Sequence, residues 1–229
     1  NVITMYWGNN KYVIRDVSVI LAKANQALST LEKYKSVLQQ SLINLSALEF
    51  ENLATLFDVA TVIQRAQMVF RIAHEIERYI VQLGSEGRLV KMQLEELMAD
   101  IADEGLLVAK DYSVVHDKSV EDIWDEMFSW DSEDLLNLSL IARALGHVGN
   151  AAILDQSVIP RGYRILSKIP RLPMPVIENL VAKFINLQEI CNASIEELDD
   201  VEGIGEVRAK AIQDGLQRLR EQVLLDRHL

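Results

Sequence analysis

Apolar side chains recur at helical spacing over most of the 229 residues, and this pattern limits what the chain can fold into. Residues three and four positions apart share one face of an amphipathic helix. The four prolines and ten glycines are few for a loop-rich or all-β protein. We therefore predict a mainly α fold. The clearest helical run has apolar residues at Ile20, Leu21, Ala24, Leu28, Leu31, Tyr34, Val37, Leu38, Leu42 and Leu45.

Polar residues next to the apolar runs predict where helices begin. Asp16 is expected to cap a helix of about 25 residues, because aspartate accepts hydrogen bonds from the first free amides. Ser46 and Glu49 have the spacing of a capping box, which predicts a second helix over residues 47–82. Later boundaries are a break near Asp58, a turn over residues 83–87 and a helix over residues 88–102.

The N-terminal residues have a different pattern. β-Branched and aromatic residues at 2–7 and 11–14 flank Gly8-Asn9-Asn10, which predicts a β-hairpin. An isolated hairpin has marginal stability in water. We therefore expect these strands to belong to a sheet that lies mostly outside this chain, or to pack on the helices that follow.

Charge is distributed unevenly along the chain, whose net charge is −11. Residues 161–229 carry 10 basic and 11 acidic side chains, so most of the excess lies in residues 1–160. Residues 94–134 hold 14 acidic and 2 basic side chains, with aromatics interleaved at 124–130. The favoured interpretation is a solvated helical segment whose aromatic side lies in the core, and the alternative is a partner-binding surface. Residues 147–160 are expected to be a linker.

Several classes of site and location are disfavoured by the sequence. Cys191 is the sole cysteine, so an intrachain disulfide and a cysteine-based metal cluster are excluded, and a reducing cytoplasmic setting fits. The four histidines have no metal-ligand spacing, and no apolar stretch reaches the roughly 20 residues of a membrane span. We expect no metal, no cofactor and no membrane partner for this chain.

The C-terminal residues contain two related units, each an apolar residue, a tight turn and a helix. The first has its turn at residues 167–173 (the first hairpin) and its helix from about Met174 to Phe184. The second has its turn at residues 201–205 (the second hairpin) and its helix from about Glu206, with Ala209 small where two helices would cross. This duplication is typical of a tandem helix-hairpin-helix domain, which grips DNA backbones without sequence preference.

The second hairpin, Val201-Glu202-Gly203-Ile204-Gly205, is the better candidate for phosphate binding. Glycines allow a close backbone approach, and the helix that follows offers free amides and a positive dipole end. The first hairpin has Arg171 and Pro173 where glycines usually stand, so it is expected to be mostly structural or to act through side chains. The candidate DNA-binding residues are Gly203, Ile204, Gly205, Val207, Arg208, Lys210, Lys168 and Arg171.

Two observations weaken or complicate this prediction. Glu202 and Glu206 lie beside the expected phosphate site and would repel it, so a weak, salt-dependent contact is expected. A helical module that uses the hairpins only for packing remains the alternative. The hairpin carbonyls could also bind a monovalent cation, which the sequence does not decide.

Six segments carry a resemblance to a known family: Asn44-Leu45-Ser46-Ala47-Leu48-Glu49-Phe50-Glu51, Gln64-Arg65-Ala66, Ile76-Glu77-Arg78-Tyr79-Ile80, Gly87-Arg88-Leu89-Val90, Pro160-Arg161-Gly162-Tyr163 and Ile169-Pro170-Arg171-Leu172-Pro173. Through them the chain resembles the bacterial DNA integrity scanning proteins, a diadenylate cyclase family, over essentially its whole length. In that family a cyclase domain precedes a helical spine and a helix-hairpin-helix domain. The resemblance implies a homo-octamer that makes cyclic di-AMP from two ATP with a divalent metal (Mg²⁺ or Mn²⁺), is suppressed by branched DNA, and works with DNA-repair partners.

The resemblance has one large departure. The family's cyclase has an Asp-Gly-Ala motif and an Arg-His-Arg motif, and neither occurs in this sequence. We therefore name no catalytic residue, and whether this polypeptide is an enzyme stays open. The expected organisation is the last hairpin of a truncated cyclase domain (1–15), a helical spine (16–146), a linker (147–160) and the tandem helix-hairpin-helix domain (161–229). The expected function is DNA binding and assembly, and the alternative is a protein-interaction scaffold.

Overall fold

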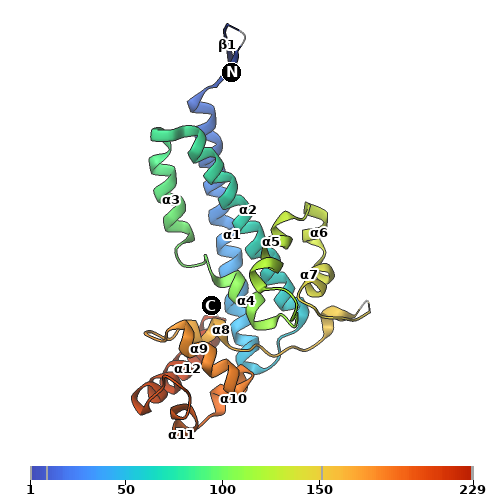
Figure 1. Cartoon of the computed structure of the whole chain (residues 1–229), viewed down its shortest axis with the longest axis vertical. Coiled ribbons are helices and arrows are strands. Elements are labelled where there is room, and N and C mark those ends of the chain that lie inside the picture. Colours follow the sequence, from blue (N-terminus) through green and yellow to red (C-terminus); the bar gives the residue numbers. More distant parts are fainter. Residues whose placement is uncertain (1, 9, 151, 228–229) are drawn as a thin grey trace. The chain divides into compact units, whose positions relative to one another are not determined.

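The structure is a computed structural model that describes residues 2–8, 10–150 and 152–227, and helices dominate it, as the sequence predicts (Figure 1). The described elements are β1 (Val2–Trp7), β2 (Asn10–Arg15), α1 (Val17–Glu51), α2 (Leu56–Leu83), the 3₁₀ helix η1 (Gly84–Gly87), α3 (Arg88–Met98), α4 (Glu104–Tyr112), α5 (Val120–Ser129), α6 (Ser132–Leu136), α7 (Leu138–Ala144), η2 (Ile153–Asp155), α8 (Tyr163–Ser167), α9 (Met174–Phe184), α10 (Leu187–Asn192), α11 (Ile195–Asp199) and α12 (Glu206–Asp226).

The chain divides into two compact units. The first consists of Asn1–Leu38 and Gln67–Ala102, and the second of Gln39–Ala66 and Asp103–Leu229. The two long helices α1 and α2 each contribute one part to the first unit and the other part to the second. Among the described residues, no helix has the length and the apolar character that a bilayer crossing requires.

The first unit contains the β-hairpin, parts of α1 and α2, and the whole of η1 and α3. Strands β1 and β2 pair antiparallel from Val2 opposite Arg15 to Trp7 opposite Asn10. As predicted, Asp16 caps α1, and its carboxylate accepts a hydrogen bond from the Ser18 amide at 2.9 Å. Helix α2 ends at Leu83 where the turn was expected, whereas α3 ends at Met98, four residues before the predicted boundary.

The predicted helix start after Ser46 is wrong. Helix α1 continues without a break to Glu51, and the Ser46 hydroxyl donates to the Leu42 carbonyl within the helix. The break comes at residues 52–55. The Thr55 amide and hydroxyl donate to the Asp58 carboxylate at 2.9 and 2.6 Å, so Asp58 helps to start α2 rather than to interrupt it.

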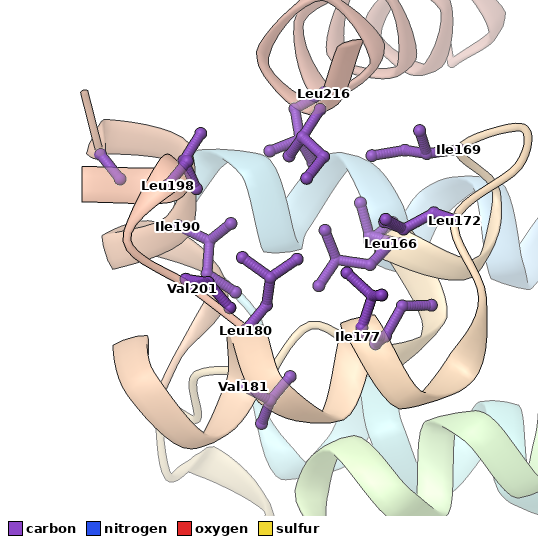
Figure 2. Close-up of a cluster of buried hydrophobic side chains, with 14 of the residues drawn as sticks. Leu166, Ile169, Leu172, Ile177, Leu180, Val181, Ile190, Leu198, Val201 and Leu216 are labelled. Atoms are coloured by element: carbon purple, nitrogen blue, oxygen red, sulfur yellow. The ribbon is translucent and has the colours of Figure 1, made fainter. Parts of the chain in front are cut away.

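One apolar cluster of the second unit lies around α9 and α12. Figure 2 shows side chains from α8 to α12 and their connections pointing toward one another. Phe50, in the last turn of α1, also belongs to this cluster, so α1 ends inside the C-terminal core. The labelled residues are Leu166, Ile169, Leu172, Ile177, Leu180, Val181, Ile190, Leu198, Val201 and Leu216.

The segment predicted as a linker, residues 147–160, is held against the turn between α1 and α2. The Leu56 amide donates to the Gln156 carbonyl at 3.0 Å, and the Val158 amide donates to the Ala54 carbonyl at 2.9 Å. Ile153 in this segment is fully buried. These contacts fix the path of the chain into α8.

The acidic segment forms α5 and α6, whose caps are Ser119 and Asp131. Trp124 is buried, and its ring lies so close to Gly105 that an added Cβ would come within 2.5 Å of it. Phe128 and Trp130 are half-buried. The aromatic side of this segment therefore faces the core, while most of its carboxylates face solvent.

A buried ionic cluster joins α1, α4 and α8 in the second unit. The Arg164 guanidinium is fully buried and donates to the Glu49 carboxylate and, at 2.9 Å, to the Ser46 hydroxyl. The Tyr112 hydroxyl donates to the other oxygen of Glu49 at 2.9 Å, and Glu104 lies 3.4 Å from Arg164. We call Ser46, Glu49, Glu104, Asp111, Tyr112 and Arg164 the Arg164 cluster.

Asp111 connects this cluster to the start of α8. Its carboxylate accepts the Gly162, Tyr163 and Arg164 amides at 2.8, 2.7 and 3.1 Å. Gly162 has φ +119°, a backbone angle that side chains rarely adopt, and this lets the chain turn into the cap. Burial raises the pKa of Asp111 to about 7, and the charge of Glu49 adds to the effect.

Replacing Arg164 by methionine should destabilise the fold by about 3–5 kcal/mol, because Glu49 would then stay buried without its partner. Glu49→Gln added to Arg164→Met should recover part of the loss. Urea unfolding followed by circular dichroism measures both variants. The exposed Arg218→Met is the control, and it should change the free energy of unfolding by less than about 0.5 kcal/mol. If Arg164→Met and Arg218→Met lowered the free energy of unfolding equally, a structural ion pair at Arg164 would be contradicted.

Asp111→Asn should change how stability depends on pH. The folded pKa of Asp111 is about 7 and its ordinary value is 3.8, so its contribution to stability is largest below pH 4 and is lost as pH rises to 7. The difference in unfolding free energy between the wild type and Asp111→Asn should therefore shrink over this range. Urea titrations at half-unit pH steps test this, and a difference that is constant with pH would refute it.

Candidate nucleic-acid interface

The second hairpin is a tight turn fixed by two buried side chains. Val201 and Ile204 lie in the apolar core, and the Ile204 amide donates to the Val201 carbonyl at 3.0 Å. Gly203 between them is exposed and has φ +84°. The side chain and the amide of Ile204 both stabilise the turn, and its contact with DNA stays a prediction.

The two glycines of this hairpin have different roles. Gly203 needs its left-handed backbone angle, and a Cβ there would lie 3.2 Å from a Val176 methyl. Gly205 has φ −114° and ψ 171°, an extended conformation open to any residue. The only atom near a Cβ at Gly205 would be an Asp199 oxygen at 3.9 Å. Gly205 therefore faces open space from which a ligand could approach.

Helix α12 starts at Gly205 without a side-chain cap in the part of the chain that the structure describes. Neighbouring helices are capped, α10 by Asn186 and α11 by a capping box of Ser194 and Glu197. An uncapped start leaves the first-turn amides and the positive end of a 21-residue helix available to an anion.

Exposed side chains surround this helix start. The Arg208 guanidinium donates to the Gly203 carbonyl, so a positive charge lies directly on the hairpin. Lys210 is exposed, and Val207 has 87% of its surface exposed. Glu202 and Glu206 are exposed as well, and they place negative charge beside the same amides.

Side chains from α9 hold the second hairpin in place, and the hairpin motif alone did not indicate these contacts. The Asn179 amide group donates to the Glu202 carbonyl at 3.0 Å. The Lys183 ammonium donates to the Glu197 carbonyl at 2.9 Å and lies 3.8 Å from Asp200. These residues join the two repeated units, a contact that periodicity within either unit does not predict.

The first hairpin has Arg171 in a left-handed conformation, φ +62°, where glycine would be unstrained. Its side chain is exposed. Pro173 is the N-cap of α9 and Pro175 follows, so this helix start has fewer amides to offer than that of α12. The first hairpin therefore presents a charged side chain more than a set of backbone donors.

Lys168 does not join Arg171 at this surface. Its ammonium lies 3.2 Å from Glu104 in the Arg164 cluster. Burial, and then the positive charge of Arg164, lower the pKa of Lys168. The structure thus separates two residues that the sequence analysis grouped.

The two hairpins line one groove with a volume of about 510 Å³. Arg171 reaches it from the first hairpin, Gly205 from the second, and Val207 and Arg208 from the first turn of α12. Ile204 and Lys210 are not among its lining residues. The complete lining is Ile169, Pro170, Arg171, Leu172, Gly205, Glu206, Val207, Arg208, Ala211 and Ile212.

Comparison with known proteins agrees with the resemblance seen in the sequence. The family model described as "DisA bacterial checkpoint controller linker region" matches residues 14–154. The chain belongs to the DNA integrity scanning protein family. The protein named DNA integrity scanning protein DisA in Carboxydothermus hydrogenoformans is 62% identical over 97% of this chain. Those of Clostridium perfringens strain SM101 and Clostridium botulinum strain Langeland are 56% and 54% identical over 100% and 99% of it.

The chain spans 63–64% of the length of these DNA integrity scanning proteins. The family model ends at residue 154, before the two hairpins. The relatives align over nearly the whole chain, so the similarity includes the hairpin-bearing helices. Among the described residues, no three His, Cys, Asp or Glu side chains gather as a metal site.

Alanine at the two glycines should separate their roles. Gly203→Ala should lower the free energy of unfolding by about 1–2 kcal/mol, because alanine resists φ +84° and its Cβ would crowd Val176. Gly205→Ala should stay within about 0.5 kcal/mol of the wild type, since its backbone is extended and its surroundings are open. Thermal and urea unfolding measure both, and equal losses would contradict the assigned conformations.

Proposed function

We propose that this chain is the DNA-binding and assembly region of a DNA integrity scanning protein. Its residues 161–229 would form a tandem helix-hairpin-helix domain that grips the backbone of branched DNA without sequence preference. The observation that carries the proposal is the uncapped start of α12 beside Gly203 and Gly205. The names of the relatives, which describe scanning of DNA integrity, support DNA as the partner.

The proposed contact has a simple physical basis. A phosphate oxygen would accept hydrogen bonds from the first-turn amides of α12, and the helix dipole would favour its charge. Arg208 beside the hairpin and Arg171 across the groove would add charge-assisted hydrogen bonds. Because these contacts go to the backbone, they carry no base sequence information.

The acidic neighbours limit the strength of a single contact. Glu202 and Glu206 are exposed beside the site, and the chain as a whole has a net charge of −11. Several copies bound to one DNA would raise the avidity without any new contact. This reasoning favours an oligomer, and the homo-octamer, the cytoplasmic location and the DNA-repair partners are proposed from the resemblance alone.

The Arg164 cluster offers a route by which DNA binding could be coupled to an N-terminal cyclase. It fixes α8, which leads into the first hairpin, to the C-terminal end of α1. The cyclase would make cyclic di-AMP from two ATP with Mg²⁺ or Mn²⁺. The described residues do not gather carboxylates that would fit this metal, so we assign no catalytic step to them.

A protein-interaction scaffold is the second candidate, and the exposed acids of α5 and α6 favour it. In that case the hairpins would only pack, and neutralising Glu121, Asp122 and Asp125 would abolish partner binding. Retained binding to DNA after this change would favour the first candidate.

Gly205→Val should weaken binding to a four-way junction by roughly tenfold, because its branched side chain would block phosphate from the α12 amides. Ala182→Val, at an exposed position of α9 outside the groove, is the control and should bind as the wild type does. Gel shifts measure both, and circular dichroism checks the fold. Unchanged junction binding by Gly205→Val would overturn the proposed contact.

The salt dependence of DNA binding should show how many phosphates each chain contacts. We expect a slope of log affinity against log salt equivalent to about two or three phosphates per chain, reduced by about one in Lys210→Ala. Lys168→Ala should leave the slope unchanged, because that ammonium is paired with Glu104. A slope that Lys210→Ala leaves intact would remove Lys210 from the site.

A further inference from the structure

The groove between the two hairpins has a composition that does not suit a phosphate. Its walls are mostly apolar, with the exposed Pro170, Val207 and Ala211 among them, and the acidic residue Glu206 also lines it. A phosphate placed inside would lose its hydration to apolar surface and meet a like charge. The proposed phosphate site lies at the edge of the groove, on the α12 amides, and leaves the interior unexplained.

We infer that this groove binds the base of an unpaired nucleotide, while the α12 amides hold an adjacent phosphate. This assignment rests on the DNA-binding function proposed above. A nucleobase is flat, with apolar faces and a polar edge, and the groove pairs apolar walls with two guanidinium groups and one carboxylate. Its volume of about 510 Å³ is within the range of small-molecule sites.

The polar residues of the groove match the edge of a base. The Glu206 carboxylate accepts hydrogen bonds and so fits the exocyclic amino group of adenine, cytosine or guanine. The guanidinium groups of Arg171 and Arg208 donate hydrogen bonds and stack on aromatic rings, so they fit ring nitrogens, carbonyls or base faces. Glu206, unfavourable for phosphate binding alone, thereby gains a function.

Val207 supplies a second argument for an opened DNA strand. It is 87% exposed on the first turn of α12. In DNA-bending proteins, exposed apolar side chains insert between base steps and partly unstack them. Val207 lines the same groove, so it could fill the gap left by the base that the groove receives.

The assignment also explains selection for branched DNA. A paired base must lose its pairing and stacking before it can leave the duplex, whereas an unpaired base at a branch or bulge has already lost part of this energy. The groove therefore favours DNA that contains unpaired nucleotides over an intact duplex, even though the backbone contacts are the same.

The test uses two duplexes of equal length, one fully paired and one with a single unpaired 2-aminopurine. The wild-type chain should bind the bulged duplex roughly tenfold more tightly and change the 2-aminopurine fluorescence. Ala211→Trp fills the groove from an exposed position of α12. It should bring the ratio of bulged-duplex to paired-duplex affinity near one, while affinity for the fully paired duplex stays within about twofold of the wild type. Ala182→Trp is the matched control and should keep the wild-type ratio.

Glu206→Ala provides a second variant that leaves the groove open. It should raise affinity for both duplexes by removing a negative charge, and it should erase the preference for an unpaired cytosine over an unpaired thymine. A wild-type ratio of one, or a ratio that Ala211→Trp leaves unchanged, overturns the base site alone. Failure of the wild type to bind either duplex overturns the DNA-binding proposal itself.

Discussion

The ion pair between Arg164 and Glu49 is the interaction on which the arrangement of the second unit depends. Both side chains are fully buried, so their charges are sustained by each other and by Ser46 and Tyr112. Because Arg164 belongs to α8 and Glu49 to α1, the position of the hairpin-bearing helices follows from the last turns of α1. Asp111 also orients α8, because its carboxylate accepts hydrogen bonds from three successive amides at the start of that helix.

The sequence predicted the helical class and the starts of α1, α3, α9 and α12, because these depend on local periodicity and on nearby caps and turns. Asp16 is such a cap, and the structure confirms it. The Ser46–Glu49 pair has the same local pattern but turns inward, because a distant arginine provides a stronger partner for Glu49. Local rules did not detect this, since the partner is 115 residues away along the chain.

At the candidate site, too, some features follow from the local sequence and others only from tertiary contacts. The glycine turn and the exposed Arg208 and Lys210 were visible as a motif. The pairing of Lys168 with Glu104, and the support of the second hairpin by Asn179 and Lys183, required the tertiary structure. The groove itself is formed by two hairpins separated by about 30 residues, so its lining was not a property of either hairpin alone.

The left-handed backbone of Arg171 has a consequence for how this fold can vary. With arginine at φ +62° the fold is less stable than with glycine by about 1 kcal/mol. The exposed side chain of Arg171 adds little stability through packing. A fold selected only for stability would favour glycine there, as at Gly203. The strain at the first hairpin is what the proposed contact of Arg171 with DNA would require, and a glycine there would gain stability at the cost of that charge.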